Sequence, residues 1–224
     1  MAVTDRQRRK KEKRRNEIID AAERLFYARG FDKVSMDEIA QEVELSKGAL
    51  YFYFKSKDSL FCVIVARKWM EFGEILKENI SHGKTGLEKI NILIRWYIQF
   101  ARENAAYNDM ATTFGPQLYQ RMDAEDSRML AEVSTKYIPS ASIAVREGIE
   151  DGSIRNDLDA VLLGMYIQII TLNVASPDPS IKNLFALHGI DYDIYTEMLP
   201  TFLCPSIAHC PEKECSDQDG SLQQ

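Results

Sequence analysis

The sequence predicts an all-α protein in which a short basic region precedes a longer acidic one. Apolar residues recur at helical spacing along most of the chain, and no alternation of apolar and polar residues is long enough to predict a sheet. Charge is also divided unevenly. Residues 1–57 carry 14 Lys and Arg against 10 Asp and Glu, whereas residues 58–224 carry 14 against 24. This asymmetry is expected of a nucleic-acid-binding head on a body that does not bind phosphate.

The composition is that of a globular protein long enough for one large domain or two modest ones. Of the 224 residues, 45% are hydrophobic and 28% are charged, which excludes disordered, collagen-like and disulfide-scaffold classes. No apolar block follows the basic start before Ile18, so we expect no signal peptide and a cytoplasmic location. Residues 160–177 carry no charge, but polar residues interrupt them and Pro177 ends them. We therefore expect a core or subunit-interface helix there instead of a membrane span.

The first residues form a dense run of positive charge. Residues 6–15 contain eight basic residues and one acidic residue, so we expect residues 1–15 to be a disordered basic arm. Because this arm adjoins a predicted nucleic-acid-binding head, a contact of the arm with phosphate or with the minor groove is an equal alternative to a solvated terminus. From Asn16, the apolar spacing predicts an amphipathic helix that ends at Gly30.

Two short helices are predicted next. Ser35 and Glu38 form a capping box for the first of them, and Ser46 supplies the N-cap of the second, which covers residues 47–54. Two such helices joined by about four residues are typical of a helix-turn-helix, a motif that places its second helix in the DNA major groove.

The second helix has one buried and one free side. Leu50 and Phe54 are expected in the core. Phe52 has two equally weighted interpretations, packing on the first helix or contact with a sugar. The free side offers small residues that allow close approach and tyrosines whose hydroxyls can bind phosphate; its members are Lys47, Gly48, Ala49, Tyr51 and Tyr53.

Three stretches of this region resemble the DNA-binding signature of TetR-type (tetracycline repressor-like) transcriptional regulators. They are GFDKVSMDEIA at 30–40, LSKGALYFYF at 45–54 and KDSL at 57–60, within a match over about residues 14–62. The resemblance implies a three-helix DNA-binding domain at 16–56 and a roughly six-helix effector-binding and dimerisation domain at 57–203. Carried over by position, it assigns DNA contacts to Ser35, Lys47, Gly48, Ala49, Tyr51, Phe52, Tyr53 and Lys57.

The implied function is that of a homodimeric repressor that binds a double-stranded, pseudo-palindromic operator and is released by a small effector. A sequence-indifferent architectural DNA-binding protein remains an alternative. An enzyme is disfavoured, because the chain has no phosphate-binding glycine loop, no His-Glu-x-x-His motif, no nucleophile elbow and only three His.

The remaining chain predicts further helices at about 57–80, 87–101, 104–122, 126–150 and 157–175. Pro116 and Pro139 are expected to break or kink them, and Asn156 is expected to cap the last. An amphipathic segment follows at 191–203, and the tail 204–224 is expected to be disordered.

The helix at 87–101 is apolar on two sides, which predicts that one side lines an effector cavity. The residues expected to line it are Trp96, Phe100, Tyr107, Phe114 and Met165. For any one of them taken alone, a place in the core is the simpler explanation. An apolar or aromatic effector is expected.

Four residues at helical spacing predict a dimer seam: Leu162, Tyr166, Ile169 and Asn173. The segment 191–203 is expected to complete the dimer interface. Near the end of the chain, four soft ligands fall within twelve residues, at Cys204, His209, Cys210 and Cys215. Their spacing matches no zinc-finger pattern, so we expect no metal and no cofactor, with a redox role or an incidental reduced tail as the alternatives. Cys62 is expected in the core.

Overall fold

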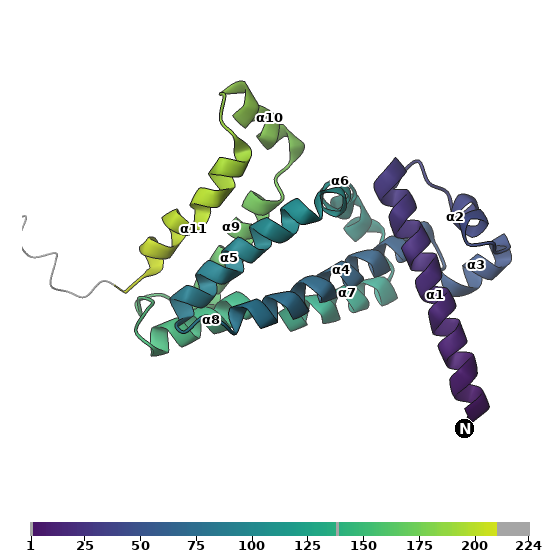
Figure 1. The fold of residues 1–224 in the computed structure, drawn as a ribbon, viewed down its shortest axis with the longest axis horizontal. Coiled ribbons are helices and arrows are strands. Elements are labelled where there is room, and N and C mark those ends of the chain that lie inside the picture. Colours follow the sequence, from purple (N-terminus) through teal and green to yellow (C-terminus); the bar gives the residue numbers. More distant parts are fainter. Residues whose placement is uncertain (1, 138, 210–224) are drawn as a thin grey trace, which may run out of the picture.

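The structure is a computed structural model that describes residues 2–137 and 139–209, and its elements are helices (Figure 1). Their order is α1 (Ala2–Arg29), α2 (Met36–Glu42), α3 (Lys47–Tyr53), α4 (Lys57–Ile80), α5 (Gly86–Glu103), α6 (Ala105–Arg121), α7 (Ala124–Tyr137), α8 (Ser140–Glu150), α9 (Ala160–Ala175), α10 (Pro179–Leu187) and α11 (Tyr192–Ile207). Within the described residues, β-structure is confined to one isolated bridge between Ile154 and Ala208. The predicted all-α class is confirmed.

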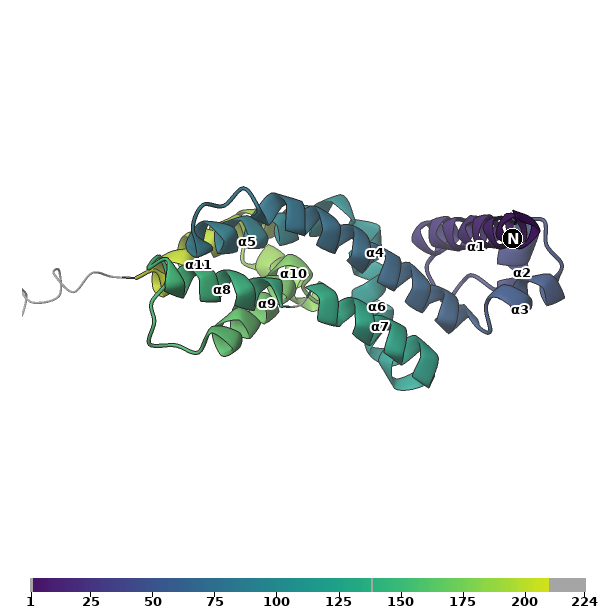
Figure 2. The same ribbon diagram turned by 90° about the horizontal axis from the view of Figure 1, so that it is seen from below.

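The helices form a small head and a longer body, arranged end to end (Figures 1 and 2). Helices α1 to α3 make the head, and α4 leads from it into the body, where it packs along α5 and α7. The head also contacts the body directly, because α1 packs on α4 and α6. A change in the body can therefore reach the head through α4 and through the α1 contacts.

One continuous apolar core joins the two parts. In the head, Ile18 of α1, Ile39 of α2 and Leu50 of α3 are fully buried. The ring of Phe31, between α1 and α2, lies edge-on 5.0 Å from the ring of Phe61 in α4. Because Phe61 is itself fully buried, the head core continues into the body without a layer of solvent.

The basic arm is helical, which corrects the expectation of disorder at residues 1–15. Helix α1 begins at Ala2, and two cations near the end of the arm have partners on other elements of the head. Arg14 donates to the Val43 carbonyl oxygen at 2.6 Å, and the Lys11 ammonium lies 4.8 Å from the centre of the Phe52 ring. The arm is thus an extension of α1 whose last residues contact the head, while its N-terminal end projects beyond α2 and α3 (Figure 1).

The boundaries of the body helices differ from expectation at three places. The predicted helix 126–150 is two helices, α7 and α8, separated by the turn at Pro139. The helix predicted from about 157 begins at Ala160, because Asp159 instead of Asn156 is its N-cap and accepts from the Leu162 amide at 2.9 Å. Pro116 lies inside α6 without interrupting it.

The C-terminal part is more regular than expected. Helix α10, which the sequence analysis did not predict, begins with Asp178 as N-cap and Pro179 at its first position. Helix α11 continues through Cys204 to Ile207, so the boundary placed before residue 204 is too early. The rest of the expected tail, residues 210–224, lies outside the described residues.

Two glycines allow the body helices to approach closely. A Cβ atom at Gly86 of α5 would lie 2.1 Å from the main-chain nitrogen of Gly148 in α8. A Cβ atom at Gly164 of α9 would lie 2.3 Å from Oγ of Ser142, also in α8. Any larger residue at either site would force these helices apart, so the glycines fix how closely α5 and α9 pack on α8.

No single helix among residues 2–137 and 139–209 has both the length and the hydropathy of a membrane span. Helices α9 and α10 reach these values only when taken together, and the chain bends by 68° between them.

Candidate DNA-binding face and effector cavity

The first helix of the helix-turn-helix is held by the capping box that the sequence predicts. The Ser35 hydroxyl accepts from the Glu38 amide at 3.2 Å, and the Ser35 amide donates to the Glu38 carboxylate at 2.8 Å. Arg29 of α1 adds a 2.6 Å ion pair to the same carboxylate. The bonds to the carboxylate, that of the Ser35 amide first and that of Arg29 second, lower the pKa of Glu38 to about 2. Ser35 therefore acts as a cap, and its expected phosphate contact stays a prediction.

A tight turn sets the angle between α2 and α3. Glu44 has a φ of 53°, a left-handed conformation, and the next residue, Leu45, donates from its amide to the Ala40 carbonyl oxygen at 2.8 Å. Ser46 then caps α3 by accepting from the Ala49 amide at 3.2 Å. Both serine caps predicted from the sequence are thus confirmed.

The outer face of α3 carries the residues expected to meet DNA. Lys47, Gly48, Tyr51 and Phe52 are exposed, while Ala49 and Tyr53 are half-buried. A Cβ atom at Gly48 would touch nothing within 4 Å, so the backbone here is open to a partner. Leu50 and Phe54 are buried, as expected.

Phe52 does not pack into the head core. Its side chain is 70% exposed, and the Lys11 ammonium of α1 lies 4.8 Å from the centre of its ring. Contact of Phe52 with DNA stays a prediction. The Lys47 ammonium lies 3.0 Å from Asp37 of α2, and this hydrogen bond raises the pKa of Lys47.

Lys57, which is expected to contact the DNA backbone, also has a structural role within the protein that the sequence did not reveal. Its ammonium donates to the carbonyl oxygens of Phe31 at 2.8 Å and Val34 at 2.9 Å, and lies 4.3 Å from the centre of the Phe31 ring. These contacts tie the start of α4 to the loop between α1 and α2. Two of its three donors are therefore used inside the head, and the phosphate contact stays a prediction.

The body contains an apolar cavity of about 310 Å³. Helices α4, α5, α6, α7 and α9 supply its wall, which is mostly aromatic and aliphatic with a few neutral polar groups and one lysine. Phe100 and Tyr107 line it, as expected from the sequence. Burial raises the pKa of the Tyr107 hydroxyl, so this group enters the cavity as a neutral hydrogen-bonding group.

The other three residues expected on the cavity wall lie elsewhere, which corrects their assignment. The ring of Trp96 stacks 6.3 Å from that of Phe72, one layer behind the wall. The ring of Phe114 lies 5.4 Å from that of Phe31, where the head meets the body. Met165 is on the exposed side of α9. Helical periodicity identifies apolar faces but not which neighbour each face meets.

Sequence reasoning missed most of the α4 contribution to the cavity. Val65, Trp69 and Phe72 line it together and recur at i, i+4 and i+7. That spacing was available as a signal. It shows that this face of α4 is apolar, but not that the face meets a cavity.

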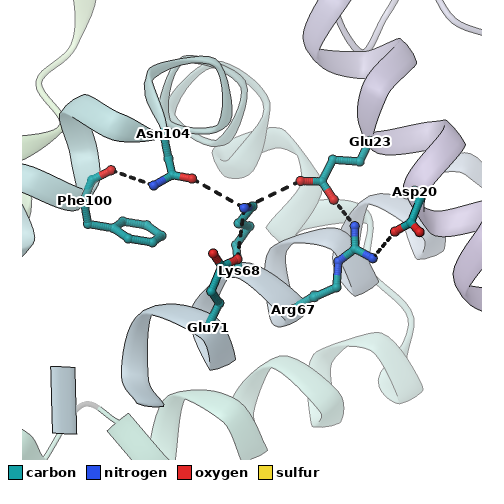
Figure 3. A network of polar contacts seen from close by, with 7 residues as sticks. All are labelled: Asp20, Glu23, Arg67, Lys68, Glu71, Phe100 and Asn104. Carbon is teal, nitrogen blue, oxygen red and sulfur yellow. Dashed lines mark hydrogen bonds and ion pairs between the residues drawn. The ribbon is translucent and has the colours of Figure 1, made fainter. Parts of the chain in front are cut away.

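A network of charged and amide side chains connects α1, α4 and the end of α5 (Figure 3). Arg67 of α4 pairs with Asp20 of α1 at 2.5 Å and also with Glu23. The adjacent Lys68 lies 3.0 Å from Glu71 on its own helix. The head is therefore attached to α4 by ion pairs as well as by the apolar core.

Lys68 continues this network to the cavity. Its ammonium lies 3.8 Å from Glu23 and 3.4 Å from the Asn104 side-chain oxygen. The Asn104 side chain in turn donates to the main-chain oxygen of Phe100 at 3.0 Å. Since Lys68 and Phe100 both line the cavity, its wall is in contact with the ion pairs that hold α1.

The residues expected at the dimer seam lie on an exposed face. Leu162, Tyr166, Ile169 and Asn173 are all exposed along α9, although Asn173 also lines the cavity. The apolar surface continues onto the next two helices, with exposed side chains at Ile181, Leu184, Leu187, Ile194, Tyr195, Met198 and Phe202. So large an apolar surface is unusual for a protein that stays monomeric.

The two cysteines within the described residues are buried and unpaired. Burial raises the pKa of the Cys62 thiol to about 12, and Cys204 accepts from the Asn91 amide at 3.6 Å. Residues 2–137 and 139–209 hold no group of three or more His, Cys, Asp and Glu suited to a metal ion. Cys210 and Cys215, named with Cys204 and His209 as soft ligands, lie outside the described residues.

Known proteins are similar to this chain in the sequence of the head and in the overall fold. Residues 18–63 match the family described as "Bacterial regulatory proteins, tetR family". The "Fatty acid metabolism regulator protein" of Bacillus subtilis (strain 168) is 26% identical over 151 residues, which are 67% of this chain and 76% of that protein.

Two solved structures have the same fold over most of their length. A TetR/AcrR-family transcriptional regulator from Thermobifida fusca aligns with a TM-score of 0.67 at 22% identity, over 86% of this chain and 97% of that one. The transcriptional regulator FadR from Bacillus subtilis, solved in complex with stearoyl-CoA, aligns with a TM-score of 0.64 at 21% identity, over 85% and 98%. The family match over residues 18–63, together with the helix-turn-helix geometry, identifies the head as similar to the DNA-binding region of the tetR family of bacterial regulatory proteins, and the body shares its fold with these solved regulators.

Proposed function

We propose that this protein is a transcriptional repressor that binds a pseudo-palindromic DNA operator as a homodimer and releases it when a small apolar or aromatic effector binds. The observation that carries the proposal is the combination, in one chain, of an exposed α3 face and an apolar cavity. Helix α4 connects the two, because it begins beside α3 and lines the cavity further along. The protein would act in the cytoplasm, where bacterial DNA lies.

Helix α3 would read the operator from the major groove. Lys47, Gly48, Ala49 and Tyr51 would face base edges, where small residues permit close approach. Contacts with the phosphates and sugars would come from Ser35, Phe52, Tyr53 and Lys57, which position the head without reading sequence. The exposed cations of the α1 extension, Arg6, Arg9, Lys10 and Lys13, would add attraction to neighbouring phosphates.

The dimer would form through the apolar face of α9 to α11. Leu162, Tyr166 and Ile169 are each more than half exposed in one protomer, and a second copy would remove them from water. Two heads held in this way would meet successive major grooves, about 34–36 Å apart.

The effector would act by changing the separation of the heads. A ligand that fits one arrangement of the cavity better than the other shifts the protein toward that arrangement. Movement of α4 would be transmitted at Lys57, which holds the loop before α2, and at Arg67, which pairs with α1. Affinity for DNA then falls by the coupling free energy between the two sites.

Selection of binding sites from a pool of random DNA duplexes tests the proposal. We expect an inverted repeat whose half-sites are one helical turn apart, bound at least about 10³-fold more tightly than random duplex at one salt concentration. Tyr51→Ala should abolish the preference, whereas Met70→Ala, an exposed apolar residue of α4, should keep it. Equal affinity for all duplexes would instead indicate an architectural DNA-binding protein.

A further inference from the structure

The cavity wall contains a single charge. Among the described residues that line it, Lys68 is the one with an ionisable cationic or carboxylate side chain, and it lies between Val65 and Phe72 on α4. The other polar groups on the wall are neutral hydroxyls and amides. A buried charge is costly unless it is paired and hydrogen-bonded, so the partners of this lysine decide whether it can also bind a ligand.

The Lys68 ammonium is incompletely satisfied by the protein. Its side chain is only 15% exposed. An ammonium has three donors, and N–H···O hydrogen bonds have lengths of about 2.7–3.2 Å. Only the 3.0 Å contact with Glu71 falls in that range, because Asn104 is 3.4 Å away and Glu23 is 3.8 Å away. Glu71 itself is half exposed, so water competes for it.

Glu23 does not depend on Lys68 for a partner. Arg67 pairs with Glu23 and also holds Asp20 at 2.5 Å. If the Lys68 ammonium moved toward the cavity, the Glu23 carboxylate would remain paired, and Figure 3 shows both cations reaching it from α4. The lysine is therefore the member of the network that can turn to another acceptor at the least cost.

We infer that the cavity binds a molecule with an apolar body and an anionic group at one end, and that Lys68 binds this group. The inference rests on the proposed function for the cavity as effector site, and adds the charge of the effector. A ligand carboxylate would add a further charge-assisted hydrogen bond to the one that the ammonium makes with Glu71, and such bonds are about twice as strong as neutral ones. A cationic group would be repelled at the same place, and a neutral one would gain less.

The same contact would connect ligand binding to the head. When Lys68 turns toward the ligand, it leaves Glu23 of α1 and Asn104, whose side chain is bonded to the Phe100 carbonyl. One of the ion-pair contacts between α4 and α1 is then lost, and α5 is freed from its link to Lys68. Lys68 is therefore both the ligand-binding cation and part of the connection between cavity and head.

Three probes with one apolar body and different end groups test the charge preference. They are 4-phenylbutanoate, 4-phenyl-1-butanol and 4-phenylbutylammonium, titrated by calorimetry at pH 7.5 into the full chain without DNA. We expect the carboxylate to bind about tenfold more tightly than the alcohol and the ammonium compound to bind most weakly.

Substitutions on either side of the contact identify the residue responsible. Lys68→Met should abolish the preference for the carboxylate while leaving affinity for the alcohol within about twofold, because a methionine keeps the apolar stem. Lys77→Met, an exposed lysine of the same helix, is the matched control and should keep the wild-type preference. Glu23→Gln should strengthen binding of the carboxylate several-fold, because it removes a negative charge that competes with the ligand for Lys68.

Several results would overturn the inference. Equal affinity for the three probes, tighter binding of the ammonium compound, or no saturable binding of any probe would each do so. A preference that survives Lys68→Met would place the anion elsewhere. If Lys68→Met does not fold, Glu23→Gln decides, since unchanged carboxylate affinity there contradicts the role of Lys68. Because no DNA is present, these outcomes are independent of whether an operator is found.

Discussion

Arg14, in the basic extension of α1, donates from Nη2 to the main-chain oxygen of Val43, the residue that ends α2, at 2.6 Å. A cation at a helix C-terminus satisfies a carbonyl that the helix cannot bond itself and complements the helix dipole. The extension is thus attached to the helix-turn-helix, so a basic residue that seems only to attract DNA also supports the fold of the head.

Arg14→Ala should therefore loosen α2 before any DNA is bound. The loss of one hydrogen bond from a charged donor should lower the local stability by about 1–2 kcal/mol. Hydrogen exchange of the α2 amides measures this effect. Arg8→Ala removes a side chain that is 77% exposed and pairs with Asp5 on its own helix, and it should leave the exchange of α2 unchanged. The same exchange rates in Arg14→Ala and wild type would show that the arm does not stabilise α2.

Lys57→Met should destabilise the head because two partly buried carbonyl oxygens lose their donor. Each unsatisfied acceptor costs about 1–3 kcal/mol, although water will replace part of that here. Chemical denaturation should show a lower midpoint for Lys57→Met. The neighbouring Lys55→Met, which removes an exposed ion pair with Glu125, should change the midpoint little. A Lys57→Met protein as stable as wild type would leave this lysine with a role in DNA contact alone.

Glu38 predicts a pH dependence of the head. Its pKa is about 2 in the folded protein, below the ordinary value of 4.5, because the Ser35 amide and Arg29 bind the ionised form. A depressed carboxyl pKa gives stability that is present above 4.5 and is lost as the pH falls from about 4.5 to 2. The stability difference between wild type and Glu38→Gln should therefore shrink between pH 5 and pH 3. A difference that is constant over this range would contradict the capping-box account.

Ile169→Glu should convert the dimer to a monomer. The side chain lies on the exposed apolar face of α9, and a second copy would bury the new carboxylate without a partner. Sedimentation measures the change directly. Met70→Glu introduces the same charge at an exposed apolar residue of α4 and should remain dimeric. A dimeric Ile169→Glu protein would show that the interface lies away from this part of α9.

Local chemistry made parts of the fold predictable. The caps at Ser35 and Ser46 act within three residues of themselves, so they were identified directly from the sequence. The sequence also predicted both ends of α4 correctly. The helical arm was missed because its stabilising partners, Val43 and Phe52, are distant in sequence.

The cavity was harder to predict for a related reason. Its wall comes from five helices, and periodicity says which face of a helix is apolar without saying which other face it meets. Phe100 and Tyr107 line the cavity, as the sequence predicts. Trp96 lies on the same apolar stripe as Phe100, but its ring stacks on Phe72 and does not reach the cavity wall. The role of Lys68 depends on Glu23, 45 positions earlier in the chain, and no local pattern indicates such a contact.

The central claim is that the cavity and the DNA-binding face are linked, and simultaneous titration of both sites tests it most directly. Trp69 lines the cavity and Trp96 does not, so in a Trp96→Phe protein the fluorescence of Trp69 reports occupancy by 4-phenylbutanoate. Affinity for the selected operator is measured in the same samples. We predict that it falls by at least about fivefold and half-saturates at the same probe concentration as the fluorescence change. Unchanged operator affinity in samples whose Trp69 signal shows a filled cavity would contradict the account.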